Sequence, residues 1–147
     1  MLKNVLAIVA GYLAMAFAVF LSFTLLYLAI GANGAFEPGS YEVSLPWIVL
    51  STILSFAAAF VGGTVCARLA TAQRAPIALA GIVLGLGLAM ALPMLNPAED
   101  LRPTVRTEAV GNMEAMANAR QPAWIALANP FIGAAGVLVG ARKRAGR

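Results

Sequence analysis

Histidine is absent from this chain of 147 residues, and cysteine occurs once, at Cys66. A chain without histidine lacks the commonest metal ligand and the usual proton carrier near neutral pH. A single cysteine cannot form an internal disulfide. These absences argue against haem, zinc and most hydrolytic chemistry, so we expect no cofactor. No paired carboxylates or nucleophile–base set is visible either, and the sequence therefore predicts a protein that is not an enzyme.

Charged residues are scarce, at 11% of the chain, whereas hydrophobic residues make up 61%. Soluble domains average about 25% charged and 45–50% apolar residues. The excess lies in four long stretches whose central parts carry no charge, so no embedded acid or base is available to couple ion movement. We therefore expect residues 1–147 to form a single integral membrane domain rather than a soluble one.

The apolar stretches predict an all-α fold, an integral membrane four-helix bundle. Each approaches or exceeds the ~20 residues that a helix needs to cross about 30 Å of hydrocarbon. Proline stands at or beside the start of three of them, where its missing N–H costs nothing. Trp47 and Trp124 lie just inside the outer boundary, at headgroup level. The predicted spans are residues 5–30, 45–67, 76–95 and 123–141.

Acidic residues occur only in two loops, residues 31–44 and 96–121, which together hold all six. Seven of the ten basic residues precede the first span, join the second to the third, or follow the fourth. Because cytoplasmic loops are enriched in Lys and Arg, this alternation predicts both termini in the cytoplasm and the two acidic loops outside. We expect a multi-pass protein of a bacterial plasma (inner) membrane.

The basic residues are interpreted as topology determinants and lipid contacts, not as a nucleic-acid surface. Near an anionic membrane surface each contributes about 1 kcal/mol. The C-terminal cluster is the clearest case, and it is a predicted contact for lipid or for a protein partner. It consists of Arg142, Lys143 and Arg144.

The second outer loop contains apolar residues at helical spacing: Val105, Ala109, Met113 and Met116. This spacing fits a short amphipathic helix lying on the outer membrane surface. A partly ordered loop covering the mouth of the bundle fits equally well. The connection between the second and third spans is short, so we expect those two helices to be antiparallel neighbours.

Small residues gather on one face of each span. Lipid provides no hydrophobic drive for helix pairing, so close packing of small faces has to supply it. We expect these faces to point inward, including the row Ala78, Gly81, Gly85 and Ala89, and the bulky faces, including Tyr27, to point outward. The phenyl groups predicted to contact lipid or a partner are Phe17, Phe20, Phe56 and Phe60.

A polar layer is predicted in the outer half of the bundle. With a rise of 1.5 Å per residue, its members fall roughly 9–15 Å below the outer boundary. They either form hydrogen bonds between helices or line a small cavity for a neutral solute, a water or a lipid headgroup. The layer consists of Ser22, Ser51, Ser55 and Asn129, the last followed by a helix-kinking proline, Pro130.

Glycine and arginine mark the inner ends of two spans, in Gly62-Gly63 with Ala67-Arg68 and in Gly140-Ala141-Arg142. In this the chain resembles uncharacterised small four-helix bacterial inner-membrane proteins, over most of its length. Those proteins tend to have a short third connection, whereas residues 96–121 are extended here. The resemblance implies no activity and no functional residues.

Two functions fit these features. The first is a non-enzymatic membrane subunit or scaffold, packed through its bulky faces against a larger membrane complex or in a homo-oligomer. The alternative is a small bundle that binds or passes a neutral solute or lipid through the polar layer. We favour the first, because it requires no chemistry that the chain lacks.

Overall fold

The computed structural model describes residues 2–95, 102–106 and 110–142. Over these residues the fold is all-α. Four helices are long and apolar enough to cross a membrane: α1 (Leu2–Ala35), α2 (Leu45–Leu69), α3 (Arg74–Ala91) with its 3₁₀ extension η1 (Leu92–Leu95), and α5 (Ala123–Arg142). A short helix, α4 (Asn112–Asn118), lies between the third and the fourth.

Two of the long helices, α2 and α5, begin where the sequence predicts, at Leu45 and Ala123. For α2 the cause is visible: the Ser44 side chain accepts a hydrogen bond from the Trp47 N–H at 3.3 Å. This is a typical N-cap, and Pro46 in the first turn needs no donor. The Ser44 hydroxyl also donates to the Gly34 carbonyl, which ties the start of α2 to the end of α1.

The first helix extends beyond its predicted end at residue 30, as far as Ala35. Helical geometry breaks at Gly31, whose φ of 67° and ψ of 179° are non-helical. Only glycine adopts this backbone conformation readily. The break redirects the last turn of α1 toward the outer loops.

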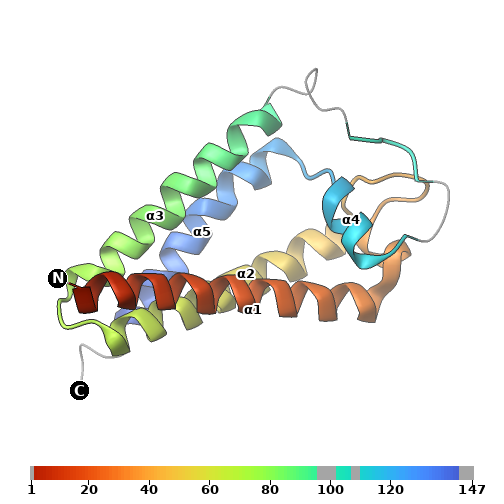
Figure 1. The fold of residues 1–147 in the computed structure, drawn as a ribbon. Helices are drawn as coiled ribbons and strands as arrows, with labels where there is room; N and C mark the ends of the chain where they lie inside the picture. The colour runs from red at the N-terminus through yellow and green to blue at the C-terminus, as the bar shows by residue number, and fades with distance from the viewer. Residues whose placement is uncertain (1, 96–101, 107–109, 143–147) are drawn as a thin grey trace.

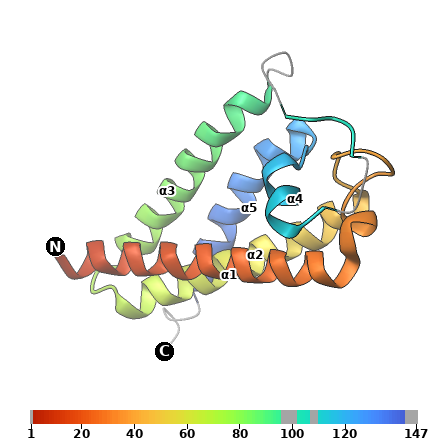
Figure 2. The ribbon, with the colours of Figure 1, turned by 45° about the vertical axis from the view of Figure 1, so that its right-hand side comes forward.

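The long helices are arranged as two pairs, α1 with α2 and α3 with α5 (Figures 1 and 2). The pairs meet at the end that holds the α2–α3 connection and diverge toward the end that holds α4. Helix α5 packs on both α2 and α3, whereas α1 and α5 make no contact. The expected neighbours α2 and α3 do touch, but each of them packs more extensively on α5 than on the other.

All four long helices contribute to one core near the meeting end. Ala7, Cys66, Leu79 and Val137 are completely buried there, one from each helix. Glycines allow the backbones to approach: a Cβ on Gly11 would lie 2.8 Å from the Gly62 carbonyl oxygen. The inward-facing small residues of α2 and α5 are therefore confirmed as packing faces, in agreement with association through close van der Waals contact.

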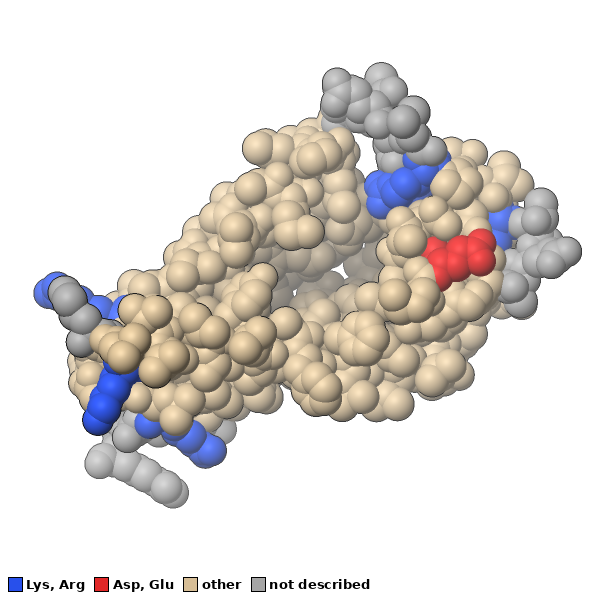
Figure 3. All heavy atoms as spheres, in the orientation of Figure 1, with Lys and Arg blue, Asp and Glu red and all other residues tan. Residues whose placement is uncertain are grey.

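On the face seen in Figure 3, the described charged side chains lie at the two ends of the molecule. In Figure 3, basic side chains lie at both ends, acidic side chains lie only at the end near α4, and the surface between them shows neither. The described basic residues at the meeting end are Lys3, Arg68, Arg74 and Arg142. This distribution matches the sequence pattern.

A cap formed by the α1–α2 connection and by described residues between α3 and α5 covers the end of α1 and α2 that lies near α4. Short bridges hold it together, pairing Ser40 with Val105 and Glu42 with Arg120. The predicted helix over the second outer loop is present only as α4, because Val105 belongs to one of these bridges. Met113 and Met116 are exposed and Ala115 is buried. The predicted position Ala109 lies outside the described residues.

Tyr27 contradicts the expected division of α1 into a small inner face and a bulky outer face. It is only 6% exposed, because the cap covers this part of the helix. Its hydroxyl donates to the Val110 carbonyl oxygen, and its ring packs edge-to-face on Phe36 and Trp47. The sequence predicted that Tyr27 faces lipid or a partner, because helical periodicity cannot show what a distant loop covers.

Candidate functional site

The four predicted members of the polar layer do not form one connected network among the described residues. The hydroxyls of Ser22 and Ser51 donate within their own helices, to Val19 and Ile48 respectively, both at 3.2 Å. Ser55 is half-buried on α2. Because the backbones of α1 and α5 do not approach each other closely, Ser22 and Asn129 do not lie side by side. The four residues therefore do not form a single polar site, but lie at separate positions on α1, α2 and α5.

Asn129 is the member with unsatisfied polar capacity. Its side-chain carbonyl oxygen is enclosed and has no hydrogen-bond partner among the described groups. An enclosed polar atom without a partner is costly, especially where no water is available. The following residue, Pro130, is buried and acts in packing: a Cβ on Gly87 of α3 would lie 2.7 Å from the Pro130 ring.

The predicted phenyl contacts differ in exposure. Phe17 and Phe20 of α1 are 67% and 49% exposed, as expected of a surface facing lipid or a partner. Phe56 of α2 is 38% exposed and Phe60 is half-buried. The reason is α5, since Gly136 and Gly140 bring its backbone against the carbonyls of Phe56 and Phe60.

The small row of α3 points outward, which contradicts the expected inward orientation. Ala78, Gly81, Gly85 and Ala89 are all exposed. The buried face of α3 instead includes Ala75, Leu79 and Ala80. The sequence could not separate these faces, because small residues occur on both sides of this helix and Leu79 is the bulky residue that fits the core.

Glycine packing distinguishes this row from the rest of the molecule. A Cβ on Gly62, Gly63, Gly133 or Gly136 would meet another helix within 3.0 Å or less. On Gly81 or Gly85 it would meet no described atom within 4 Å. These two glycines lie four residues apart, so they form one open strip along α3, the helix at the edge of the ribbon in Figures 1 and 2.

Arg142 ends α5 and is exposed. The other two predicted members of the basic cluster, Lys143 and Arg144, lie outside the described residues. Within the described part of the chain, no group of three or more His, Cys, Asp or Glu side chains could hold a metal ion.

The outer cap contains a buried cation that the sequence did not reveal. Arg106 is 8% exposed, and its guanidinium donates to the Ser40 carbonyl and to the Asn33 side chain, both at 3.3 Å. The same group lies 5.7 Å from the centre of the Phe36 ring, a cation–π distance. Basic residues in outer loops are ordinarily solvated, so sequence offered no signal for this role.

Tyr41 and Glu114 link the first outer loop to α4. The Tyr41 hydroxyl donates to the Glu114 carboxylate at 2.9 Å. This hydrogen bond, together with burial, raises the pKa of Tyr41 above its ordinary value. Arg106 and Tyr41 therefore both hold loops of the cap in place.

No protein-family model, curated protein or solved structure matches this chain. Its functional interpretation therefore depends on the surfaces described above.

Proposed function

We propose that this chain is a non-enzymatic subunit or scaffold of a larger membrane assembly, to which it contributes the outward face of α3. In this proposal the four long helices form a bundle in a bacterial plasma membrane, with both termini in the cytoplasm. The alternation of basic and acidic loops supports that orientation. The exposed row on α3 carries the proposal of a partner.

The helical glycines differ in whether another helix lies against them. Seven helical glycines, Gly11, Gly62, Gly63, Gly87, Gly133, Gly136 and Gly140, bring one helix close to another within the chain. Gly81 and Gly85 belong to a row of small residues of the same kind, but a Cβ on either would meet no described atom within 4 Å. Close approach of backbones at small-xxx-small rows is the common mode of helix pairing in lipid. A further transmembrane helix, from another protein or from a second copy, accounts for the open row.

The exposed phenyl groups of α1 supply a second predicted contact zone. Phe17 and Phe20 present large apolar area, and aromatic residues are enriched in protein interfaces. Phe56 and Phe60 belong to the same prediction, although α5 already shares that side of α2. The α3 row is the stronger candidate, because bulky side chains suit lipid as well as a partner.

The test is recovery of a partner from native membranes after the α3 row is filled. A Gly81→Ile/Gly85→Ile variant places two branched side chains where a partner helix would approach. The matched control is Ala16→Ile/Ala57→Ile, which places the same two side chains at exposed positions of α1 and α2. We expect the α3 variant to recover about ten-fold less partner, or less of the higher oligomer, equivalent to ~1.4 kcal/mol.

The control variant is expected to retain the partner. Equal recovery from both variants would remove the α3 row from the proposal. A parallel Phe56→Leu/Phe60→Leu variant tests the phenyl surface, because loss of the partner there with retention in the α3 variant would relocate the interface to α2.

The unpartnered oxygen of Asn129 favours a second candidate function, the binding or passage of a neutral solute or lipid. Asn129→Leu keeps the side-chain size and removes the acceptor. We expect this variant to fold, as measured by thermal unfolding, and to lose binding or flux in liposomes. Flux that persists in the variant would leave Asn129 with a structural role only.

A further inference from the structure

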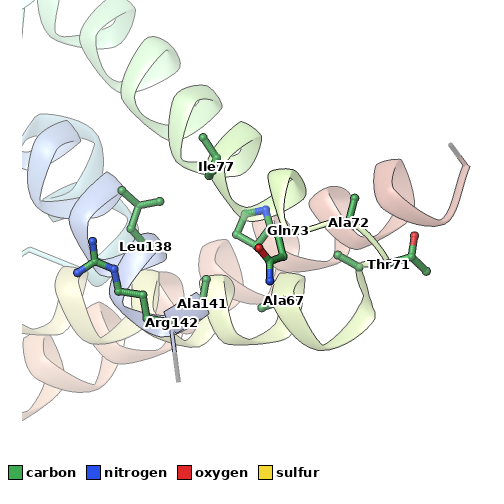
Figure 4. A pocket seen from close by; sticks show the side chains of 10 residues that line it. Ala67, Thr71, Ala72, Gln73, Ile77, Leu138, Ala141 and Arg142 are labelled. Atoms are coloured by element: carbon green, nitrogen blue, oxygen red, sulfur yellow. The ribbon is translucent and has the colours of Figure 1, made fainter. Parts of the chain in front are cut away.

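A groove of ≈ 670 Å³ opens at the end where the two helix pairs meet. Its walls come from the last turn of α2, the α2–α3 connection, the first turn of α3 and the last turn of α5 (Figure 4). The volume lies within the range of about 300–1,000 Å³ that is typical of ligand sites.

One wall of this inner groove is fixed by a side chain from α1. The Asn4 side-chain oxygen accepts hydrogen bonds from the Thr71 N–H at 2.9 Å, the Thr71 hydroxyl at 3.0 Å and the Ala72 N–H at 3.1 Å. These three contacts hold the α2–α3 connection in a defined conformation. The groove is therefore preorganised, which reduces the ordering cost of binding.

The inner groove is polar at its rim and apolar farther in. Gln73 and Arg142 are exposed at the rim, and Figure 4 shows them on opposite sides of the groove. Ile77 and Leu138 lie four residues along α3 and α5 from these two, so they are about 6 Å deeper toward the middle of the spans. The site thus has a polar-to-apolar gradient along the direction of the helices.

The electrostatic field at this end favours a negative ligand. Lys3, Arg68, Arg74 and Arg142 all lie here, whereas every acidic residue of the sequence belongs to the loops at the opposite end of the spans. The first turn of α3 has no side-chain cap. The positive end of the α3 helix dipole adds partial positive charge to the same end of the molecule.

The gradient and the field together select among occupants. A free inorganic anion would leave the walls at Ile77 and Leu138 unused. A second copy of this end would bring the same positive charges and repel the first. An anionic phospholipid satisfies both features, and basic pockets between membrane helices are known to accept such headgroups.

We propose that the inner groove binds an anionic phospholipid of the adjacent leaflet, with its phosphate at the rim formed by Arg142 and Gln73 and its acyl chains over Ile77 and Leu138. None of the residues that line the groove belongs to the α3 row, and the proposal does not depend on the identity of a protein partner. It assigns a specific binding site to Arg142, beyond a general attraction to the membrane surface.

The test is lipid retention by the full-length protein, counted by native mass spectrometry after delipidation in detergent and titration with one lipid at a time. The lipids are phosphatidylglycerol and phosphatidylcholine with identical chains, and soluble glycerol phosphate is the headgroup control. Arg142→Gln is compared with Arg68→Gln, which removes the same charge at the same end but outside the groove. Thermal unfolding verifies that each variant is folded.

We expect the wild type to retain phosphatidylglycerol in preference to phosphatidylcholine. Arg142→Gln should weaken phosphatidylglycerol binding about five-fold, the effect of one basic contact with an anionic headgroup, and Arg68→Gln should leave it nearly unchanged. Leu138→Ser should weaken phosphatidylglycerol binding without affecting glycerol phosphate, because it alters only the apolar wall.

Three results would overturn the proposal. Equal losses in Arg142→Gln and Arg68→Gln would mean a diffuse attraction of charge. Glycerol phosphate binding as tightly as phosphatidylglycerol would mean a site for a soluble anion. A change in oligomer mass on Arg142→Gln, with lipid binding unaltered, would mean that a second copy occupies the groove.

Discussion

Single residues determine where the outer end of α1 turns. Gly31 has a φ of 67° and a ψ of 179°, and a Cβ there would meet no described atom within 4 Å. A side chain at residue 31 would therefore have room, but residues other than glycine rarely adopt this backbone conformation. The cost of substitution at this position comes from the backbone alone.

We predict that Gly31→Ala destabilises the protein by about 1–3 kcal/mol, the usual cost of a non-glycine residue in this region. Gly81→Ala is the control, because Gly81 is helical and equally open. Thermal unfolding in detergent measures both. If the two variants unfold at the same temperature, the break at Gly31 does not constrain the fold.

Tyr41 gives the cap a dependence on pH. Its pKa is raised because its hydroxyl donates to the Glu114 carboxylate and because it is buried. A group with a raised pKa contributes its stabilisation fully below the unfolded-state value, about 10 for tyrosine. That contribution is lost as the pH rises through the higher folded-state value.

We therefore predict that the wild type loses more thermal stability between pH 9 and about pH 11 than Tyr41→Phe does. At pH 8 the wild type should be the more stable of the two, because only it has the hydrogen bond to Glu114. The measurement is a series of unfolding curves over this pH range. Parallel curves would show that the Tyr41 hydroxyl does not stabilise the cap.

Among the helices, α2 and α5 show the closest packing. A Cβ on Gly63 would overlap the Val137 carbonyl, and one on Gly140 would overlap the Phe60 carbonyl. These obstacles are backbone atoms, which cannot rotate away. The pair must therefore separate if either glycine acquires a side chain.

We predict that Gly63→Ala lowers the free energy of unfolding by about 1–3 kcal/mol, the range for overpacking a well-packed contact. Gly85→Ala makes the same chemical change on α3 without an obstacle, so it should cost nothing in the isolated protein. Denaturant titration of both variants measures the difference. Equal stability would contradict the close α2–α5 contact.

The existence of the four long helices and the starting points of α2 and α5 could be predicted from sequence, because hydropathy and the prolines Pro46 and Pro122 act locally. The faces could be predicted only where one side was clearly smaller, as on α5 with Gly133, Gly136 and Gly140. On α3, alanine and glycine occur on both sides of the helix. The face that points inward therefore depends on where Leu79 packs, which the sequence of this helix does not show. The burial of Tyr27 and Arg106 depends on loops distant in sequence, and periodicity contains no information about them.

For the whole molecule, the arrangement combines a cap at one end, a basic groove at the other and an open small face along α3. The cap stabilises the outer end of α1 and α2, the groove is the proposed lipid site, and α3 is the proposed contact with another helix. The central claim is that the chain functions as part of a larger membrane assembly.

The most direct test of that claim is the mass of the intact particle after extraction in native lipid, with protein and lipid content determined together. We predict a stoichiometric second protein or a defined homo-oligomer, lost when Gly81 and Gly85 are replaced by isoleucine. A particle that holds a single copy of this chain and lipid alone, from membranes that express it at its natural level, would contradict the account.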